Sequence, residues 1–139
     1  TMANLLEDLA FIRELQPQMI GIGPFIPHHA TPFKNYPAGT LEQTLTLLSV
    51  LRLMFPKVLL PATTALGTIV PNGRELGILA GANVVMPNLS PADVRQNYLL
   101  YDNKLCSGAE AAETKNDLAA RLHSIGYEIA EGRGDYKES

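Results

Sequence analysis

The chain has 139 residues, of which 46% are apolar and 18% are charged, and its formal net charge is -3. This size suits one domain with a modest core, and the scattered Lys and Arg residues give no broad basic surface for nucleic acid. The lone cysteine, Cys106, excludes an internal disulfide and any zinc or iron–sulfur site built from this chain's cysteines alone, and the absence of a long apolar run excludes a membrane span.

The first predicted element is a helix. Leu5, Leu9 and Ile12 recur at helical spacing, Asn4 is a candidate N-cap, and Pro17 closes the helix. No strand precedes this helix, so the start looks like a piece cut from a longer chain, behind the remnant of a tag.

Three short apolar runs are predicted to be strands: residues 19–23, 58–60 and 83–86. They lack polar alternation, which is typical of parallel strands that are buried on both faces. Each run is followed by a proline and a polar loop, a place where the ladder is ending and no backbone N–H is needed.

A long helix is predicted between the first two strands. Thr40 is a candidate N-cap, and Gln43, three residues later, completes the pattern of a capping box. The apolar stripe of this helix begins at Leu41 and ends at Met54 or Phe55.

A short helix over residues 74–79 and a final helix built on Leu118 and Leu122 follow, with residues 127–129 as a short added strand. Alternation of strands and helices implies parallel strands joined by right-handed crossovers. Three strands are too few to close a barrel, which takes about eight. The sequence therefore predicts an α/β fold, the C-terminal part of a (βα)8 TIM-type barrel, with three parallel βα units and a C-terminal helical extension.

The predicted domain boundary lies near residue 90. Residues 1–90 form the half-barrel, and residues 91–139 form the extension that closes the barrel end. A three-stranded piece leaves two bare sheet edges, which are sites for pairing with another chain. We therefore expect either a missing N-terminal half-barrel as the natural partner or self-association of this chain through those edges.

Candidate chemistry is expected at the C-terminal ends of the strands, where parallel barrels place their sites. Thr63 and Thr64 follow the second strand, and adjacent threonines offer hydroxyl and backbone N–H donors that suit a carboxylate or a phosphate. The alternative is an ordinary threonine-rich turn, in which the hydroxyls bond to nearby backbone atoms. The residues alone leave both interpretations open.

Other polar and sulfur-bearing side chains follow the strands. His28 and His29 are expected to point to opposite faces, and no nearby Asp, Glu or Cys completes a ligand set, so a His lining a polar pocket is favoured over a metal site. Met86 is core packing by default. Tyr98 and Tyr101 share a face on a helical turn, either over the opening of the site or packed against the barrel.

The remaining motif is glycine-rich. Gly21 and Gly23 lack the third glycine and the following helix of a dinucleotide fingerprint, and instead indicate close approach of the backbone to a ligand or to a neighbouring strand. Cys106 is interpreted as a small, partly buried apolar residue, and the scarcity of cysteine agrees with a cytoplasmic location.

In this order, the stretches described above resemble the radical S-adenosylmethionine enzymes of the biotin synthase-like group, and within that group the maturases of iron–iron hydrogenase. The match runs from about Leu5 to about Lys104 and is weaker beyond Cys106. It is carried by the segments MIGIGPFIPH (19–28), PATTA (61–65), GTIVP (67–71), GRE (73–75), GANV (81–84) and MPN (86–88), and by Arg95, Gln96, Tyr98 and Tyr101.

The resemblance implies a complete βα barrel with a four-iron, four-sulfur cluster and S-adenosylmethionine, which together generate a radical that acts on a small, sulfur-containing, amino-acid-like substrate. It identifies residues 91–139 as an extension of the biotin and thiamin synthesis associated type. It implies residues that hold the substrate carboxylate or line the substrate cavity: Thr63, Thr64, Met86, Tyr98 and Tyr101. It implies cofactor-binding residues at the end of the first strand: Pro24, Phe25 and Ile26.

The chain departs from this family in one essential motif. The three cysteines spaced C-x3-C-x2-C, which hold the cluster in the family, are absent, and Cys106 cannot replace them. The basic residues that help to clamp the substrate carboxylate in the family's first half are also missing. No catalytic and no metal-binding residue is therefore assigned, and the chain by itself is expected to be inactive.

Two alternatives stay open. Biotin synthase or a methylornithine-forming relative would use the same barrel on a different substrate. A non-catalytic binding module, which is a different class of protein, would keep the pocket loops and lack the cluster.

Overall fold

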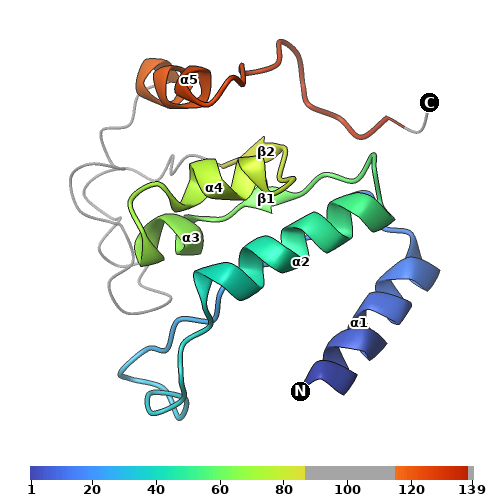
Figure 1. The fold of residues 1–139 in the computed structure, drawn as a ribbon, viewed down its shortest axis with the longest axis vertical. Helices are drawn as coiled ribbons and strands as arrows, with labels where there is room; N and C mark the ends of the chain where they lie inside the picture. The colour runs from blue at the N-terminus through green and yellow to red at the C-terminus, as the bar shows by residue number, and fades with distance from the viewer. Residues whose placement is uncertain (87–114, 138–139) are drawn as a thin grey trace.

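The computed structural model describes residues 1–86 and 115–137. In chain order the elements are α1 (Met2–Leu15), α2 (Leu41–Met54), β1 (Pro61–Ala62), α3 (Thr64–Ile69), α4 (Gly73–Leu79), β2 (Val84–Val85) and α5 (Lys115–Ser124). Helices α1 and α5 lie at opposite ends of the molecule, with the strands and the other helices between them (Figure 1). Within the described ranges, no helix has the length and apolar character that a membrane crossing needs.

Helix α1 forms where the leucine spacing predicted it, but the predicted cap is wrong. Thr1 is the N-cap, and its hydroxyl oxygen accepts a hydrogen bond from the backbone N–H of Asn4 at 3.3 Å. The helix ends at Leu15 because Gln16 adopts a left-handed conformation, with φ 50°, immediately before Pro17.

Helix α2 begins and ends where the sequence predicted, and the threonine half of the predicted capping box is present. The hydroxyl oxygen of Thr40 accepts from the backbone N–H of Gln43 at 3.2 Å, which satisfies one of the free donors of the first turn. The apolar stripe finishes at Phe55, which is buried, and not at Met54, which remains partly exposed. The buried face of α2 therefore points at the strands.

The strand segments run parallel and side by side. Met19 forms a parallel bridge with Leu59, supported by hydrogen bonds of 3.0 Å from Ile20 N–H to the Leu59 carbonyl and from Leu59 N–H to the Gln18 carbonyl. Further along, β1 pairs with β2 in parallel, with Pro61 opposite Val84. The structure is thus mixed α/β with short strands, and the three complete βα units stay a prediction.

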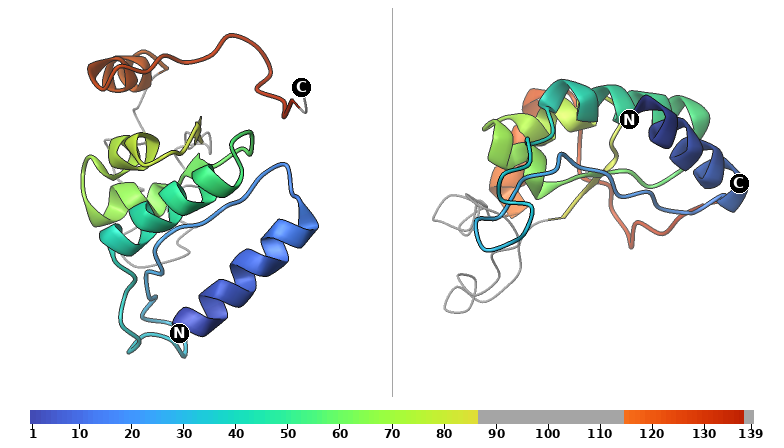
Figure 2. Two further views of the ribbon diagram at one scale, coloured as in Figure 1. Left: turned by 45° about the vertical axis from the view of Figure 1, so that its right-hand side comes forward. Right: turned by 90° about the horizontal axis from the view of Figure 1, so that it is seen from below.

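The prediction that the first strand segment, residues 19–23, is buried on both faces is wrong. Exposure alternates along it, since Ile20 is 6% exposed while Met19 is 47% exposed. The reason is that helices cover only one face of the strands: α2 lies over the strand traces in the right-hand view of Figure 2. Alternate residues of a strand point to opposite faces, so the other face of this first segment remains open, whereas Pro61 and Ala62 of β1 are both buried.

The second predicted strand, residues 58–60, pairs with the first segment at Leu59, and its pairing with β2 begins beyond the predicted end, at Pro61. The N–H of Leu60 donates to the side-chain oxygen of Asn83 at 2.8 Å, and not to a backbone carbonyl of the neighbouring segment. The Leu60 carbonyl accepts from the N–H groups of both Asn83 and Val84, at 2.9 and 3.1 Å. A side chain thus replaces one backbone hydrogen bond between these two segments, and the regular pairing of β1 with β2 starts after it.

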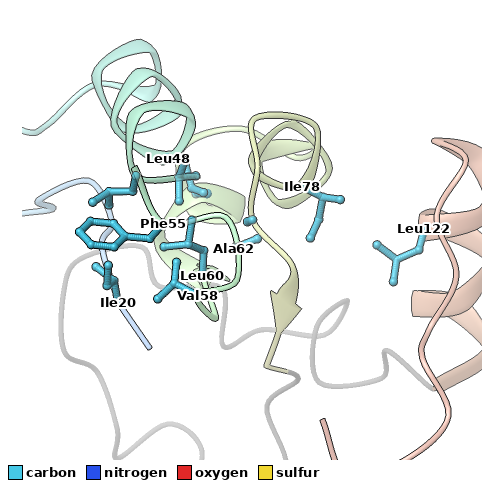
Figure 3. Close-up of a cluster of buried hydrophobic side chains, with 11 residues drawn as sticks. Ile20, Leu48, Phe55, Val58, Leu60, Ala62, Ile78 and Leu122 are labelled. Atoms are coloured by element: carbon cyan, nitrogen blue, oxygen red, sulfur yellow. The ribbon is translucent and has the colours of Figure 1, made fainter. Parts of the chain in front are cut away.

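One hydrophobic core joins these elements. Its buried members come from the strand segments, α2, α3, α4 and α5: Ile20, Leu48, Leu51, Phe55, Val58, Leu60, Ala62, Leu66, Ile78, Ala82 and Leu122. Figure 3 shows most of the labelled side chains gathered between α2, α4 and the strands, with Leu122 reaching in from α5. The core therefore lies on the helix-covered face of the strands.

Helix α3 is an element that sequence analysis assigned to a loop. It has six residues and contains both Gly67 and Thr68, so it shows neither the length nor the propensity that marks a helix. The fully buried side chain of Leu66 anchors it to the core. Tertiary packing therefore decides the conformation of this segment, and Thr63 becomes its N-cap residue.

The partly buried side chain of Arg52 connects the C-terminal end of α2 to the turn before β2. Its Nε donates to the Gly81 carbonyl at 2.8 Å, and its Nη1 donates to the carbonyls of Pro56 and Phe55 at 2.8 and 3.3 Å. Burial lowers the pKa of Arg52. This side chain holds the end of α2 against the turn that leads into β2.

Helix α5 packs where its leucine pattern predicted, through Leu122 and an ion pair between Arg121 and Glu75 of α4. Partial burial alone would raise the pKa of Glu75, but its interactions with Arg121 outweigh this and lower it. The predicted strand at residues 127–129 is wrong. These residues have no strand conformation, and together with Val85 they line a hollow of about 290 Å³.

Candidate functional site

The register of the strand segments creates a row of residues at their C-terminal ends. Met19 lies opposite Leu59, and Pro61 lies opposite Val84. Because side chains alternate between faces with a period of two residues, continuing this register places Gly23, Thr63 and Met86 in one row on the face opposite the core. We call these three residues the strand-end row.

Contact between the first two members of the row is direct. A Cβ atom built on Gly23 would lie 2.8 Å from the hydroxyl oxygen of Thr63, closer than real Cβ contacts allow. The backbone of Gly23 and the side chain of Thr63 therefore touch across the gap between the two segments. The close approach expected at the glycine pair takes place at Gly23, while a Cβ built on Gly21 meets nothing within 4 Å.

The Thr63 hydroxyl is not used locally. Thr63 is the N-cap residue of α3, with φ -71° and ψ 157°, a position where a threonine hydroxyl usually accepts from a free N–H of the first turn. It makes no such bond, and its oxygen is buried with no hydrogen-bond partner in the part of the chain that the structure describes. An unpaired buried hydroxyl costs about 1–3 kcal/mol, so it favours a site that a polar ligand group completes.

Thr64 has a different environment. It is the first residue of α3 and is half-buried, and its backbone carbonyl accepts a hydrogen bond from the hydroxyl of Thr68 at 3.2 Å. The ordinary local bonding considered as the alternative for this segment is therefore present at Thr68 and absent at Thr63. The two adjacent threonines are not equivalent, and Thr63 is the one whose hydroxyl lies in the row.

The predicted cofactor-binding residues follow directly after the row. Pro24 is buried, Ile26 is half-buried, and Phe25 is partly exposed with its ring edge-on to that of Phe33, at 6.4 Å between centroids. The Phe25 carbonyl accepts from the N–H of Gly39 at 2.8 Å, which closes the loop on itself. Pro24 therefore lies one position beyond the row, while Phe25 presents an aromatic surface next to it.

The expected orientation of the paired histidines is wrong. The rings of His28 and His29 stack, with centroids 4.5 Å apart and planes 22° from parallel, because the chain turns here and is not extended. The Nδ1 atom of His28 accepts from the N–H of Ala30 at 3.0 Å. Across residues 1–86 and 115–137, no three His, Cys, Asp or Glu side chains gather to hold a metal ion.

The third strand brings Met86 to the row. Its side chain is 53% exposed, so the default interpretation of Met86 as core packing is wrong. Tyr98, Tyr101 and Cys106 lie outside the described residues, and their predicted roles stay predictions. Sequence analysis noted Gly23 only as part of a glycine-rich segment, and the structure adds it to the site. Its spacing could have indicated this, because Gly23 lies two residues after Gly21 and four after Met19, on the same face of the strand.

The arrangement suits the binding of a small polar ligand at one rim. A buried hydroxyl without a partner, a half-exposed thioether and an exposed aromatic ring lie at the carboxyl ends of neighbouring parallel strands, which is where α/β folds bind ligands. The described residues at this rim offer hydrogen bonding and apolar contact. They do not include an acid–base pair or a nucleophile with its base.

Comparison with known proteins identifies relatives for most of the chain. No known family profile matches it. The chain is 48% identical over 106 residues, 76% of its length, to the [FeFe] hydrogenase maturase subunit HydE of Thermotoga maritima. It is 37% identical over 89 residues to the 3-methylornithine synthase of Methanosarcina barkeri, and 28% identical over 127 residues to that of Methanosarcina acetivorans. The matched stretches cover 30%, 25% and 35% of these relatives, so the chain spans about a third of their length.

Proposed function

Because this chain belongs to the radical S-adenosylmethionine enzymes, the family of these relatives, we propose that it is the C-terminal part of a larger, TIM-barrel-like enzyme of the hydrogenase-maturase type. Its substrate is a small, amino-acid-like, sulfur-containing molecule. The chain contributes one wall of the substrate cavity, and the rest of the enzyme contributes the reactive centre. A cytoplasmic location is part of the same proposal.

The Thr63 hydroxyl carries this proposal. It is buried, unpartnered among the described residues and placed at the strand-end row, so a carboxylate oxygen at the rim would accept the hydrogen bond that no protein group takes. Thr64 adds a second threonine beside it, and Met86 adds an apolar wall. In the proposal, Tyr98 and Tyr101 complete the cavity from outside the described residues.

The proposed cofactors divide between this chain and the rest of the enzyme. The described residues hold no group of side chains suited to the four-iron, four-sulfur cluster, so the proposal assigns its ligands to the remaining part of the barrel. Phe25 and Ile26 do fit a nucleoside, because a partly exposed ring and an apolar side chain lie beside the row. S-adenosylmethionine bound with the cluster supplies a 5′-deoxyadenosyl radical, and this chain orients the substrate and keeps water away from it.

The test replaces Thr63 by valine, which removes the hydroxyl and keeps the shape, in the complete enzyme that contains this segment. We expect KM for the amino-acid-like substrate to rise about 10- to 100-fold, because one hydrogen bond to a charged group is lost. Thr68→Val is the matched control, since among the described residues the Thr68 hydroxyl bonds to the Thr64 carbonyl within α3. The chain alone, supplied with iron, sulfide and S-adenosylmethionine, is the negative control and should form no 5′-deoxyadenosine.

An unchanged KM in Thr63→Val would contradict the role of the hydroxyl. Turnover of dethiobiotin, and not of cysteine-derived substrates, would favour a biotin synthase-like enzyme. The relatives named 3-methylornithine synthase support an amino-acid product as the second candidate. Substrate binding without any 5′-deoxyadenosine formation by the complete protein would favour a binding module.

We also propose that the isolated chain associates with itself. Within the described residues, the segment around Met19 pairs only with that around Leu59, and β2 pairs only with β1, which leaves an unpaired edge on each side. Unpaired strand edges promote pairing between chains, and the missing half-barrel would cover them in the complete enzyme. Light scattering should show dimers or larger species, and a monodisperse monomer would contradict the proposal.

A further inference from the structure

Gly23 occupies a position where a side chain is excluded by one neighbour alone. The three heavy atoms closest to a Cβ built on Gly23 all belong to Thr63: Oγ1 at 2.8 Å, and Cβ and Cγ2 both at 3.6 Å. Gly23 is not among the described glycines with positive φ, so an L-residue can adopt its backbone conformation. This position therefore needs glycine because there is no room for a side chain beside the Thr63 hydroxyl, and not because of its backbone conformation.

The absence of a side chain at Gly23 determines which rotamer the Thr63 side chain can adopt. The Cβ atom of threonine carries a hydroxyl, a methyl group and a hydrogen, and staggering allows one of the three to face Gly23. In the structure, the group that faces Gly23 most closely is the hydroxyl. With an alanine at position 23, only the Cβ hydrogen of Thr63 would fit there, and the hydroxyl would have to turn away.

A second destination for the hydroxyl lies close by. Thr63 already has the extended backbone conformation of an N-cap, and α3 begins at the next residue. A hydroxyl displaced from Gly23 can therefore turn to the first turn of α3 and accept from the N–H of Ala65, because the Leu66 N–H already donates to the Thr63 carbonyl at 3.1 Å. Glycine at position 23 thus allows the rotamer in which the Thr63 hydroxyl faces the row. A larger residue would favour the rotamer in which the same hydroxyl caps α3.

We propose that Gly23 is the positioning residue for Thr63: by leaving its side-chain space empty, it sets the rotamer that presents the Thr63 hydroxyl to the substrate carboxylate. This inference rests on the proposed function of Thr63. It adds a residue that does not itself contact the substrate. The observation that carries it is the 2.8 Å approach at Gly23, together with the absence of a side-chain cap at Thr63.

The first experiment measures the rotamer of Thr63 in this chain by three-bond scalar couplings to its Cγ2 atom. In the unchanged chain the couplings should place the hydroxyl, and not the methyl group, toward Gly23. Gly23→Ala should shift them to another rotamer. Gly21→Ala is the matched control, because it adds the same methyl group to the same segment at a place with no atom within 4 Å.

The second experiment measures substrate turnover in the complete enzyme that contains this segment. Gly23→Ala should raise KM for the amino-acid-like substrate about 10- to 100-fold, as Thr63→Val does, while Gly21→Ala leaves it unchanged. The double variant Gly23→Ala with Thr63→Ser should recover part of this loss. Serine has no γ-methyl group, so its hydroxyl can avoid the new methyl and still reach the row.

The outcomes separate this inference from the proposed function. If the couplings in the unchanged chain place the methyl group toward Gly23, or if folded Gly23→Ala keeps the original couplings, the positioning role is overturned, whatever Thr63→Val does. If the couplings shift but neither Gly23→Ala nor Thr63→Val changes KM, the role of Thr63 in substrate binding is what fails. If the Gly23→Ala chain does not fold, the couplings measured in the unchanged chain alone test the positioning role.

Discussion

Replacing Gly73 by alanine should destabilise the chain by about 3 kcal/mol, a large part of the stability of a small domain. A Cβ atom at this position would lie 2.0 Å from the backbone carbonyl oxygen of Leu66 and 2.4 Å from its carbonyl carbon. These are main-chain atoms of α3, so no side-chain rotation relieves the clash. Alanine would otherwise favour the helix by about 1 kcal/mol over glycine, and the clash reverses that sign.

Urea unfolding followed by circular dichroism measures this difference. Gly21→Ala serves as the control, because its added methyl group meets nothing within 4 Å. Gly77→Ala should fall between the two, since its new methyl group would lie 3.0 Å from the end of the Leu66 side chain and 3.2 Å from the Ala62 Cβ atom, which are tight side-chain contacts and not a clash with the main chain. Equal midpoints for Gly73→Ala and Gly21→Ala would show that α3 and α4 do not pack as closely as the structure describes.

The long amphipathic elements could be predicted from the sequence, and the short ones could not. Helix α2 has fourteen residues with a clear leucine stripe and a threonine cap, so local signals and packing agree. Helix α3 has six residues and is held by the buried Leu66, which is a tertiary effect. The start of β1 depends on the side chain of Asn83, which no periodicity reveals.

The candidate site shows the same limit. The sequence located Thr63 and Met86 at the ends of strands, because prolines and apolar runs mark those ends. It chose Pro24 for the first strand, whereas the register selects Gly23. That register depends on hydrogen bonds between Ile20 and Leu59, and an offset of one residue moves a side chain to the opposite face. The ends of strands can therefore be predicted from residue types. Which residues lie opposite one another in the row depends on the strand register, which only the structure gives.

Leu60 links the stability of the core to the geometry of the row, and Leu60→Ala should destabilise the chain by about 3 kcal/mol. Its side chain is fully buried, so truncation leaves a cavity, and its N–H and carbonyl groups bind Asn83. Loosening this position would also disturb Thr63, three residues later.

Leu53→Ala in α2 removes the same atoms from a side chain that is 82% exposed, and should change the free energy of unfolding by less than about 0.5 kcal/mol. Urea unfolding of both variants, with hydrogen exchange at the Thr63 amide as a second measurement, compares them directly. If the two substitutions were equally mild, Leu60 would not be part of a close-packed core. The row would then lack the rigid layer of side chains beneath it that holds Thr63 against Gly23.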